Sequence, residues 1–203
     1  MAKQEIRQPQ QKRAVQKKHQ IILAGYQLFS EKGYHSTNTA EIARAAHVST
    51  GIVYSYFKDK KAILLDVVRF YLDGLSAQFA PLFASPITPQ ALPGLLSQLI
   101  DLLLASHTMA PKAHDEFLAL SLLEPDVRAL FDAFEQALLR QLQGPLRTGG
   151  FSEHLLAEKI EIVYGLIEQV CHEQLRHPRP PKEFEAIKAL AVQAAVVLLH
   201  PAV

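Results

Sequence analysis

The stretch GYHSTNTAEIARAAHVSTGIVYSYFKDKK, residues 33–61, contains the start signals of two short helices. Asn38 followed by Glu41 forms a capping box, which predicts a helix that begins at Thr39. Ser49 lies where its side chain can cap a second helix, after a three-residue turn. Two short helices joined by such a turn have the geometry of a helix-turn-helix, which places its second helix in the major groove of DNA.

The second short helix, predicted from Thr50 to about Phe57, has two different sides. At about 100° per residue, Val53 and Phe57 share one side and are expected to anchor the helix in a core. The other positions carry small, polar or aromatic side chains: Gly51, Ser55, Tyr54 and Tyr56. A small outward side lets the backbone approach base edges closely, and flanking tyrosines can reach phosphates. The alternative for the two tyrosines is a local aromatic core.

The segments on either side of this stretch are predicted to be helical as well. Apolar residues recur at helical spacing from Ile21 onward, and Gly33 is expected to cap that helix in a left-handed conformation. Asp59 is expected to cap a further helix that continues to about Phe79. Residues 1–13 are polar and rich in Gln and Lys, so they are expected to form a flexible basic arm.

The run V-S-x-G-x-x-Y-x-Y-F-x-x-K at residues 48–60, together with residues 33–43, closely resembles the tetracycline-repressor (TetR) family. The resemblance covers about residues 17–65 and is far more specific than a generic helix-turn-helix pattern. It implies a DNA-binding transcriptional regulator. One departure is His47, where the family usually has glycine, and histidine tolerates a left-handed turn better than most residues.

The resemblance also implies DNA contacts for individual positions. Thr39 is expected to contact a phosphate together with the amides at the start of its helix. Tyr56 and Lys60 match phosphate contacts. Ser49, the expected cap of the second helix, is a further candidate DNA contact. The positions that match the major-groove surface are Thr50, Gly51, Tyr54 and Ser55.

The charge of the chain is unevenly distributed, although the net charge is only +1. Residues 1–61 carry 11 Lys and Arg against 4 Asp and Glu, whereas residues 62–203 carry 10 against 16. A basic segment joined to an acidic one suggests that only the first meets a polyanion. The alternative is a solvated basic tail, because six of those eleven cations lie between Lys3 and Lys18.

The rest of the chain is predicted to be helical and punctuated by prolines, which makes the whole fold all-α with about nine helices. The expected domains are residues 14–62, which bind DNA, and 63–203, which bind an effector and dimerise. The later helices are expected at about 88–106, 111–123, 124–146, 152–176 and 182–200.

The last two predicted helices have broad apolar faces that must be buried, either in the protomer or against a second copy. The resemblance implies a homodimer in which these helices pair into a four-helix bundle, and a two-fold protein suits a palindromic operator. The residues expected at this interface are Val163, Ile167, Leu190, Ala194 and Val197.

The middle helices would form an effector pocket in this family. Large apolar side chains with few polar groups would suit a small apolar or aromatic effector. An ordinary core or surface role remains the alternative for each candidate. The candidate ligand-binding residues are Phe79, Leu103, His107, Phe117, Phe134, Glu168 and His172.

Other functions lack their motifs in this sequence. No phosphate loop, dinucleotide fingerprint, nucleophile elbow or metal-ligand spacing is present, so we expect no catalytic residue, no metal and no cofactor. No apolar stretch is long enough for a membrane span, and the single Cys171 fits a reducing cytoplasm, where the protein would associate with the nucleoid. The rival hypothesis is an adaptor that binds proteins and keeps the helix-turn-helix only as a scaffold.

Overall fold

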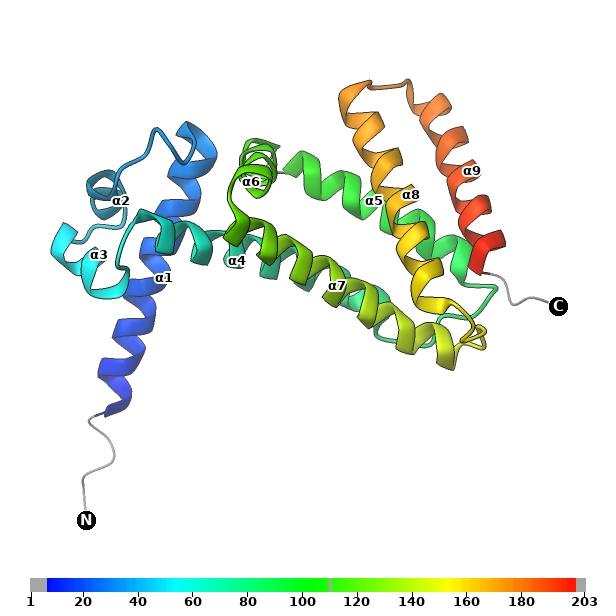
Figure 1. The fold of residues 1–203 in the computed structure, drawn as a ribbon, viewed down its shortest axis with the longest axis horizontal. Coiled ribbons are helices and arrows are strands. Elements are labelled where there is room, and N and C mark those ends of the chain that lie inside the picture. The colour runs from blue at the N-terminus through cyan, green and yellow to red at the C-terminus, as the bar shows by residue number, and fades with distance from the viewer. Residues whose placement is uncertain (1–6, 110, 200–203) are drawn as a thin grey trace, which may run out of the picture. The chain divides into compact units, whose positions relative to one another are not determined.

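A computed structural model describes residues 7–109 and 111–199, with side chains for 13–106 and 112–199. The described residues form nine α-helices and one short 3-10 helix without any strand, which confirms the all-α prediction (Figure 1). The elements are α1 Arg7–Lys32, α2 Thr39–Ala45, α3 Thr50–Tyr56, α4 Lys60–Phe79, η1 Ala80–Phe83, α5 Leu92–Met109, α6 Pro111–Leu123, α7 Pro125–Thr148, α8 Leu156–Arg176 and α9 Pro181–Leu199.

Helix α1 begins earlier than the sequence suggested. The prediction of a flexible arm over residues 1–13 is wrong for residues 7–13, which are helical. Gln, Lys and Arg are good helix formers, and Pro9 lies in the first turn, where the missing amide has no partner to lose. Residues 1–6 of the predicted arm lie outside the described residues.

Two other helices begin later than predicted. The Thr88 side chain accepts a hydrogen bond from the Ala91 amide at 3.3 Å, which closes a turn ahead of α5 rather than the helix itself. Ser152 likewise accepts from the His154 amide at 3.2 Å, and α8 starts only after Leu155, whose φ is +53°. In both cases a Ser or Thr side chain closes a local turn, a motif that competes with helix capping.

The chain forms two compact units. The first comprises residues 1–73 and 110–131, and the second comprises 74–109 and 132–203, within the described parts of both. The sequence predicts α6 in the second domain, residues 63–203. In the structure Phe117 of α6 is fully buried in the first unit, with its ring 6.0 Å from that of Tyr26 and 5.4 Å from that of Tyr71. Aromatic burial therefore attaches α6 to the helix-turn-helix.

The first unit has its own apolar core beneath the helix-turn-helix. Phe29 of α1, Ile42 of α2 and Val53 of α3 are fully buried, and Phe57 is 4% exposed. The predicted anchoring of the second short helix through Val53 and Phe57 is therefore confirmed. Burial of such large side chains contributes about 1.5–3 kcal/mol each, so this small core fixes α3 firmly.

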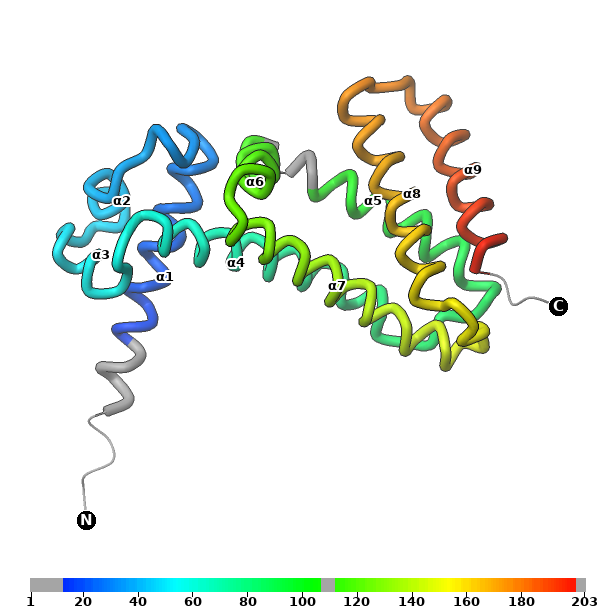
Figure 2. Tube along the Cα trace, viewed as in Figure 1, coloured from blue at the N-terminus to red at the C-terminus, as the bar shows by residue number. Residues whose placement is uncertain are grey.

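The second unit is built on a larger core shared by α5, α7, α8 and α9. Helices α8 and α9 lie side by side along their length (Figure 2). A tight backbone crossing closes this unit at the end of α7. The Ile87 amide donates to the Pro145 carbonyl at 2.9 Å, and a Cβ on Gly149 would overlap the Ile87 carbonyl oxygen. Only glycine fits at position 149.

None of the described helices combines the length and the hydropathy that a membrane crossing requires.

Candidate nucleic-acid interface

The start of α2 is built by the predicted capping box. The Asn38 side chain accepts from the Glu41 amide at 3.0 Å, and the Glu41 carboxylate accepts from the Asn38 amide at 3.1 Å. Lys32 lies 2.9 Å from the same carboxylate, and this hydrogen bond is the main reason that the pKa of Glu41 is lowered. Thr39, the first residue of α2, is half-buried at the helix N-terminus, where backbone amides can donate hydrogen bonds to an anion.

The turn between α2 and α3 has the backbone that the sequence analysis expected at His47. Its φ is +54°, in the left-handed region. The Val48 amide donates to the Ala43 carbonyl at 3.0 Å, which closes the turn around His47. Histidine therefore occupies the position where the family usually has glycine, without changing the geometry of the turn.

Helix α3 presents an outward face of small, polar and aromatic residues. The Ser49 side chain accepts from the Ile52 amide at 3.3 Å and caps the helix. Tyr54 is 55% exposed, whereas Tyr56 is half-buried. The aromatic-core alternative therefore does not hold for Tyr54. The exposed predicted residues of this face are Ser49, Thr50, Gly51, Tyr54 and Ser55.

Gly51 has no reason within the fold to be glycine. A Cβ at this position would meet only the Ser49 hydroxyl oxygen, at 3.9 Å, which is an ordinary contact. Glycine inside a helix usually costs about 0.5–1 kcal/mol relative to alanine. The predicted close approach of DNA at Gly51 stays a prediction.

Lys60 makes contacts inside the protein that the sequence analysis did not anticipate. Its ammonium donates to the carbonyls of Tyr34 and Thr37, both at 2.8 Å, and lies 4.3 Å from the centroid of the Tyr34 ring. Two of its three N–H donors are thereby used. The predicted phosphate contact of Lys60 stays a prediction, and only the third donor is left for it.

The surface around these helices carries further cations that the sequence analysis did not single out. Arg44 on α2 and Lys58 between α3 and α4 are exposed. The sequence could not show that these two cations lie beside α3, and lysine and arginine are frequent on any protein surface.

A family model described as bacterial regulatory proteins of the tetR family matches residues 21–67, which contain α2, α3 and parts of α1 and α4. The helix-turn-helix segment is of the tetR type. The match agrees with the capped helices, the turn at His47 and the exposed face of α3 described above.

Named relatives match the chain over different lengths. The transcriptional regulator HbdR of Aromatoleum sp. (strain CIB) is 50% identical over 58 residues, which cover 29% of this chain. The chain spans only about a quarter of the length of HbdR, since the match covers 25% of it. The transcriptional repressor KstR2 of Rhodococcus jostii is 24% identical over 156 residues, 75% of each chain.

A solved structure has a similar fold. A Mesorhizobium loti protein assigned to the TetR-family transcriptional regulators superposes with a TM-score of 0.73 and 22% identity. The comparison covers 92% of this chain and 98% of that one, so the likeness extends through both compact units.

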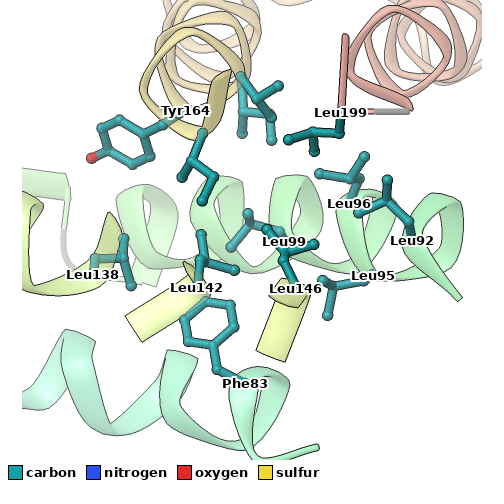
Figure 3. Close-up of a pocket in the computed structure, with 13 residues that line it drawn as sticks. Phe83, Leu92, Leu95, Leu96, Leu99, Leu138, Leu142, Leu146, Tyr164 and Leu199 are labelled. Atoms are coloured by element: carbon teal, nitrogen blue, oxygen red, sulfur yellow. The ribbon is translucent and has the colours of Figure 1, made fainter. Parts of the chain in front are cut away.

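The second unit contains an apolar cavity of about 30 Å³ (Figure 3). Its walls are leucines and other apolar side chains of η1, α5, α7, α8 and α9, and Tyr164 flanks it with the hydroxyl directed away from the leucines. A cavity of this size holds about one water molecule, whereas ligand sites usually measure 300–1,000 Å³. A molecule much larger than water fits here only if side chains rearrange.

Three predicted ligand-binding residues lie in the core that surrounds this cavity and not in its wall. Phe79 and Leu103 are buried in the same core, and Phe134 packs against it. Phe117 is buried in the first unit and does not line this cavity, so its ligand-binding role stays a prediction. The side chain of His107 lies outside the described residues.

Glu168 and His172 form a polar pair on α8, with carboxylate and ring nitrogen 3.4 Å apart. Burial raises the pKa of Glu168, an effect that the charge of His172 opposes. Burial also raises the pKa of Tyr164, one turn earlier on the same face of α8. The three side chains form a row of hydrogen-bonding groups next to the apolar cavity.

The residues predicted at the dimer interface fall into two groups. Val163 and Ile167 are 5% and 1% exposed and belong to the core of the second unit, so their assignment to an interface is wrong. They point inward because α8 uses this face to cover α5 and the cavity. Leu190, Ala194 and Val197 of α9 are exposed, and these assignments stay a prediction.

Ile162 of α8 is a surface residue that the sequence analysis missed. It is 61% exposed, next to the buried Val163. Helical periodicity alone could not tell which apolar residues of α8 face inward, because α8 carries apolar side chains on both sides.

Within the part of the chain whose side chains are described, no three His, Cys, Asp or Glu residues are grouped as a metal site would need.

Proposed function

We propose that the protein is a dimeric transcriptional repressor that binds a palindromic DNA operator and is released by a small apolar or aromatic effector. The observation that carries this proposal is the exposed face of α3, which is capped, anchored and free of bulky side chains at Gly51. KstR2, which matches three-quarters of this chain, is named a transcriptional repressor.

Base reading would come from the exposed α3 residues. Thr50, Tyr54 and Ser55 can donate or accept hydrogen bonds at base edges in the major groove, and Gly51 lets the backbone approach. Phosphate contacts would come from the α2 N-terminus at Thr39 and from Tyr56. The excess of cations in residues 1–61 would add sequence-independent attraction.

Two copies of α3 would read the two halves of the operator. The exposed apolar residues on α8 and α9 support a dimer through this surface, because an isolated protomer would leave Ile162, Leu190 and Val197 in water. One recognition helix alone offers too little contact for tight specific binding. The two-fold symmetry of the dimer would match the palindrome.

The effector would enter the second unit. The leucine-lined cavity and the nearby row of Tyr164, Glu168 and His172 suit a molecule with an apolar body and one polar group. Because the cavity is only about 30 Å³, occupation requires a rearrangement of α5, α7 or α8. A ligand that prefers the rearranged state shifts the population toward it, and α4 is continuous from the first unit to the second.

The test is selection of DNA from a random duplex pool, followed by affinity measurements on the enriched sequence and on random DNA. We expect a palindromic sequence and an affinity that falls steeply with salt. Ser55→Ala should cost roughly 1–3 kcal/mol on the enriched sequence and little on random DNA. Ser76→Ala, at an exposed serine of α4, is the matched control. Failure to enrich any sequence would favour the adaptor hypothesis.

A further inference from the structure

The turn between α1 and α2, residues 33–38, is held by two charged side chains from other helices. The Tyr34 amide donates to a carboxylate oxygen of Glu116 on α6 at 2.6 Å, between residues 82 positions apart in the sequence. The Tyr34 carbonyl accepts from the Lys60 ammonium on α4 at 2.8 Å. A carboxylate on the amide and an ammonium on the carbonyl thus fix the same residue from both sides.

The Glu116 carboxylate lies directly against the glycine that ends α1. Gly33 has a φ of +85°, and a Cβ there would be in ordinary contact with the nearer carboxylate oxygen of Glu116, at 3.4 Å. The left-handed backbone is therefore the reason for glycine at position 33. The Tyr34 ring is 9% exposed and packs edge-on against Phe29, so the residue that Glu116 holds is itself part of the core.

The turn leads directly into the start of α2. The Thr37 side chain donates to the Gly33 carbonyl at 2.9 Å, and Asn38 is the cap of α2. A shift of Tyr34 is therefore transmitted through four residues to the free amides beside Thr39. Hydrogen bonds to ionised groups are shorter and stronger than neutral ones, so the Glu116 carboxylate is a firm anchor for this path.

From this geometry we infer that Glu116 is a positioning residue for DNA binding, which acts by holding the 33–38 turn and hence the N-terminus of α2. This inference rests on the proposed function. It assigns a part in DNA binding to a helix that lies outside the 21–67 segment that matches the family model. Glu116 itself touches no DNA in this role.

The experiment compares Glu116→Ala and Glu116→Gln with the wild-type chain. Glutamine keeps a carbonyl oxygen that can accept from the Tyr34 amide, whereas alanine does not. On the DNA sequence that the wild type enriches, we expect about tenfold weaker binding for Glu116→Ala and an affinity within about threefold of wild type for Glu116→Gln. Asp115→Ala, at the exposed neighbouring carboxylate, is the matched control and should bind as the wild type does.

A spectroscopic measurement checks the hydrogen bond separately from DNA. Selective ¹⁵N-tyrosine labelling gives six amide resonances, and Tyr34→Phe identifies the one that belongs to Tyr34. This resonance should move upfield in Glu116→Ala and stay close to its wild-type position in Glu116→Gln. Both measurements are made well below the unfolding temperature of each variant, which excludes loss of binding through unfolding.

The outcomes separate the two proposals. A wild-type chain that enriches no DNA sequence overturns the proposed function. A wild type that binds while Glu116→Ala binds equally well, with the Tyr34 resonance shifted, overturns the positioning role alone. Equal losses in Glu116→Ala and Asp115→Ala would also overturn it, because they would show a general effect of the charge on α6.

Discussion

At the scale of single residues, Gly51 separates folding from DNA binding. Because its Cβ position is open, we expect Gly51→Ala to raise the free energy of unfolding by up to about 1 kcal/mol. The gain should be smaller than in the middle of a helix, because Gly51 lies in the first turn of α3. The same substitution should weaken binding to the enriched DNA, since a methyl group would then stand between the helix and the bases. Urea unfolding and a mobility-shift assay measure the two effects.

The matched control is Gly74→Ala on α4, where a Cβ meets nothing within 4 Å. It should stabilise the protein at least as much as Gly51→Ala and leave DNA affinity unchanged. Unchanged DNA affinity in Gly51→Ala would show that α3 does not approach a partner at this position.

Lys60 and Tyr56 should differ, although the sequence analysis assigned both to phosphates. Lys60→Ala removes the donor from two carbonyls and should lower the free energy of unfolding by about 1–3 kcal/mol. Tyr56→Phe should leave stability unchanged and weaken binding to enriched and random DNA alike, because phosphate contacts carry no sequence information. If Lys60→Ala kept the wild-type free energy of unfolding and only lowered the slope of log K against log salt concentration, phosphate binding would be the main role of Lys60.

The caps at Asn38, Ser49 and Asp59 were predictable from the sequence, because each cap acts within three residues of itself. The partners of Lys60 and Glu116 were not, since the fold alone brings Tyr34 to both. Sequence patterns identify local hydrogen bonds well and long-range ones poorly for this physical reason.

At the scale of helices, α8 shows that the position of a helix in the sequence is easier to predict than the face that it buries. Its extent was nearly correct, but Val163 and Ile167 face the core and Ile162 faces outward. Cys171, about two turns after Val163 on the same helix, is fully buried, and burial raises the pKa of its thiol to about 12. Both facts mean that the reactive thiolate is absent from the folded state.

We therefore expect the folded protein to resist iodoacetamide at pH 8, and the urea-unfolded protein to react readily. Cys171 is the only cysteine in the sequence, so the mass gain reports this site without ambiguity. Rapid modification in the absence of urea would show that the packing of α8 against α5 opens frequently.

At the scale of the whole molecule, the dimer proposal predicts different effects for glutamate substitutions on α9 and on α8. Leu190→Glu changes an exposed residue of α9, so the protomer should stay folded while the dimer dissociates. Val163→Glu places a charge in the core and should unfold the second unit, at a cost of several kcal/mol. Sedimentation and circular dichroism distinguish the two results. A Leu190→Glu variant that remains dimeric would place the interface elsewhere.

The division of the chain into units was the least predictable level. The helix-turn-helix was visible because a short segment contains all of its signals, whereas α6 joins the first unit through Phe117 and Glu116, far away in the sequence. The apolar cavity could not be predicted either, since its wall comes from one 3-10 helix and four α-helices.

The backbone crossing between Ile87 and Gly149 has a consequence for libraries of variants. Every residue other than glycine at position 149 must push apart two main chains that a hydrogen bond from Ile87 to Pro145 holds together. In a saturation library sorted by the cellular abundance of the protein, position 149 should therefore lose all nineteen alternatives. Position 51 should keep alanine in that sort and lose it only when the cells are sorted again for silencing of a reporter gene.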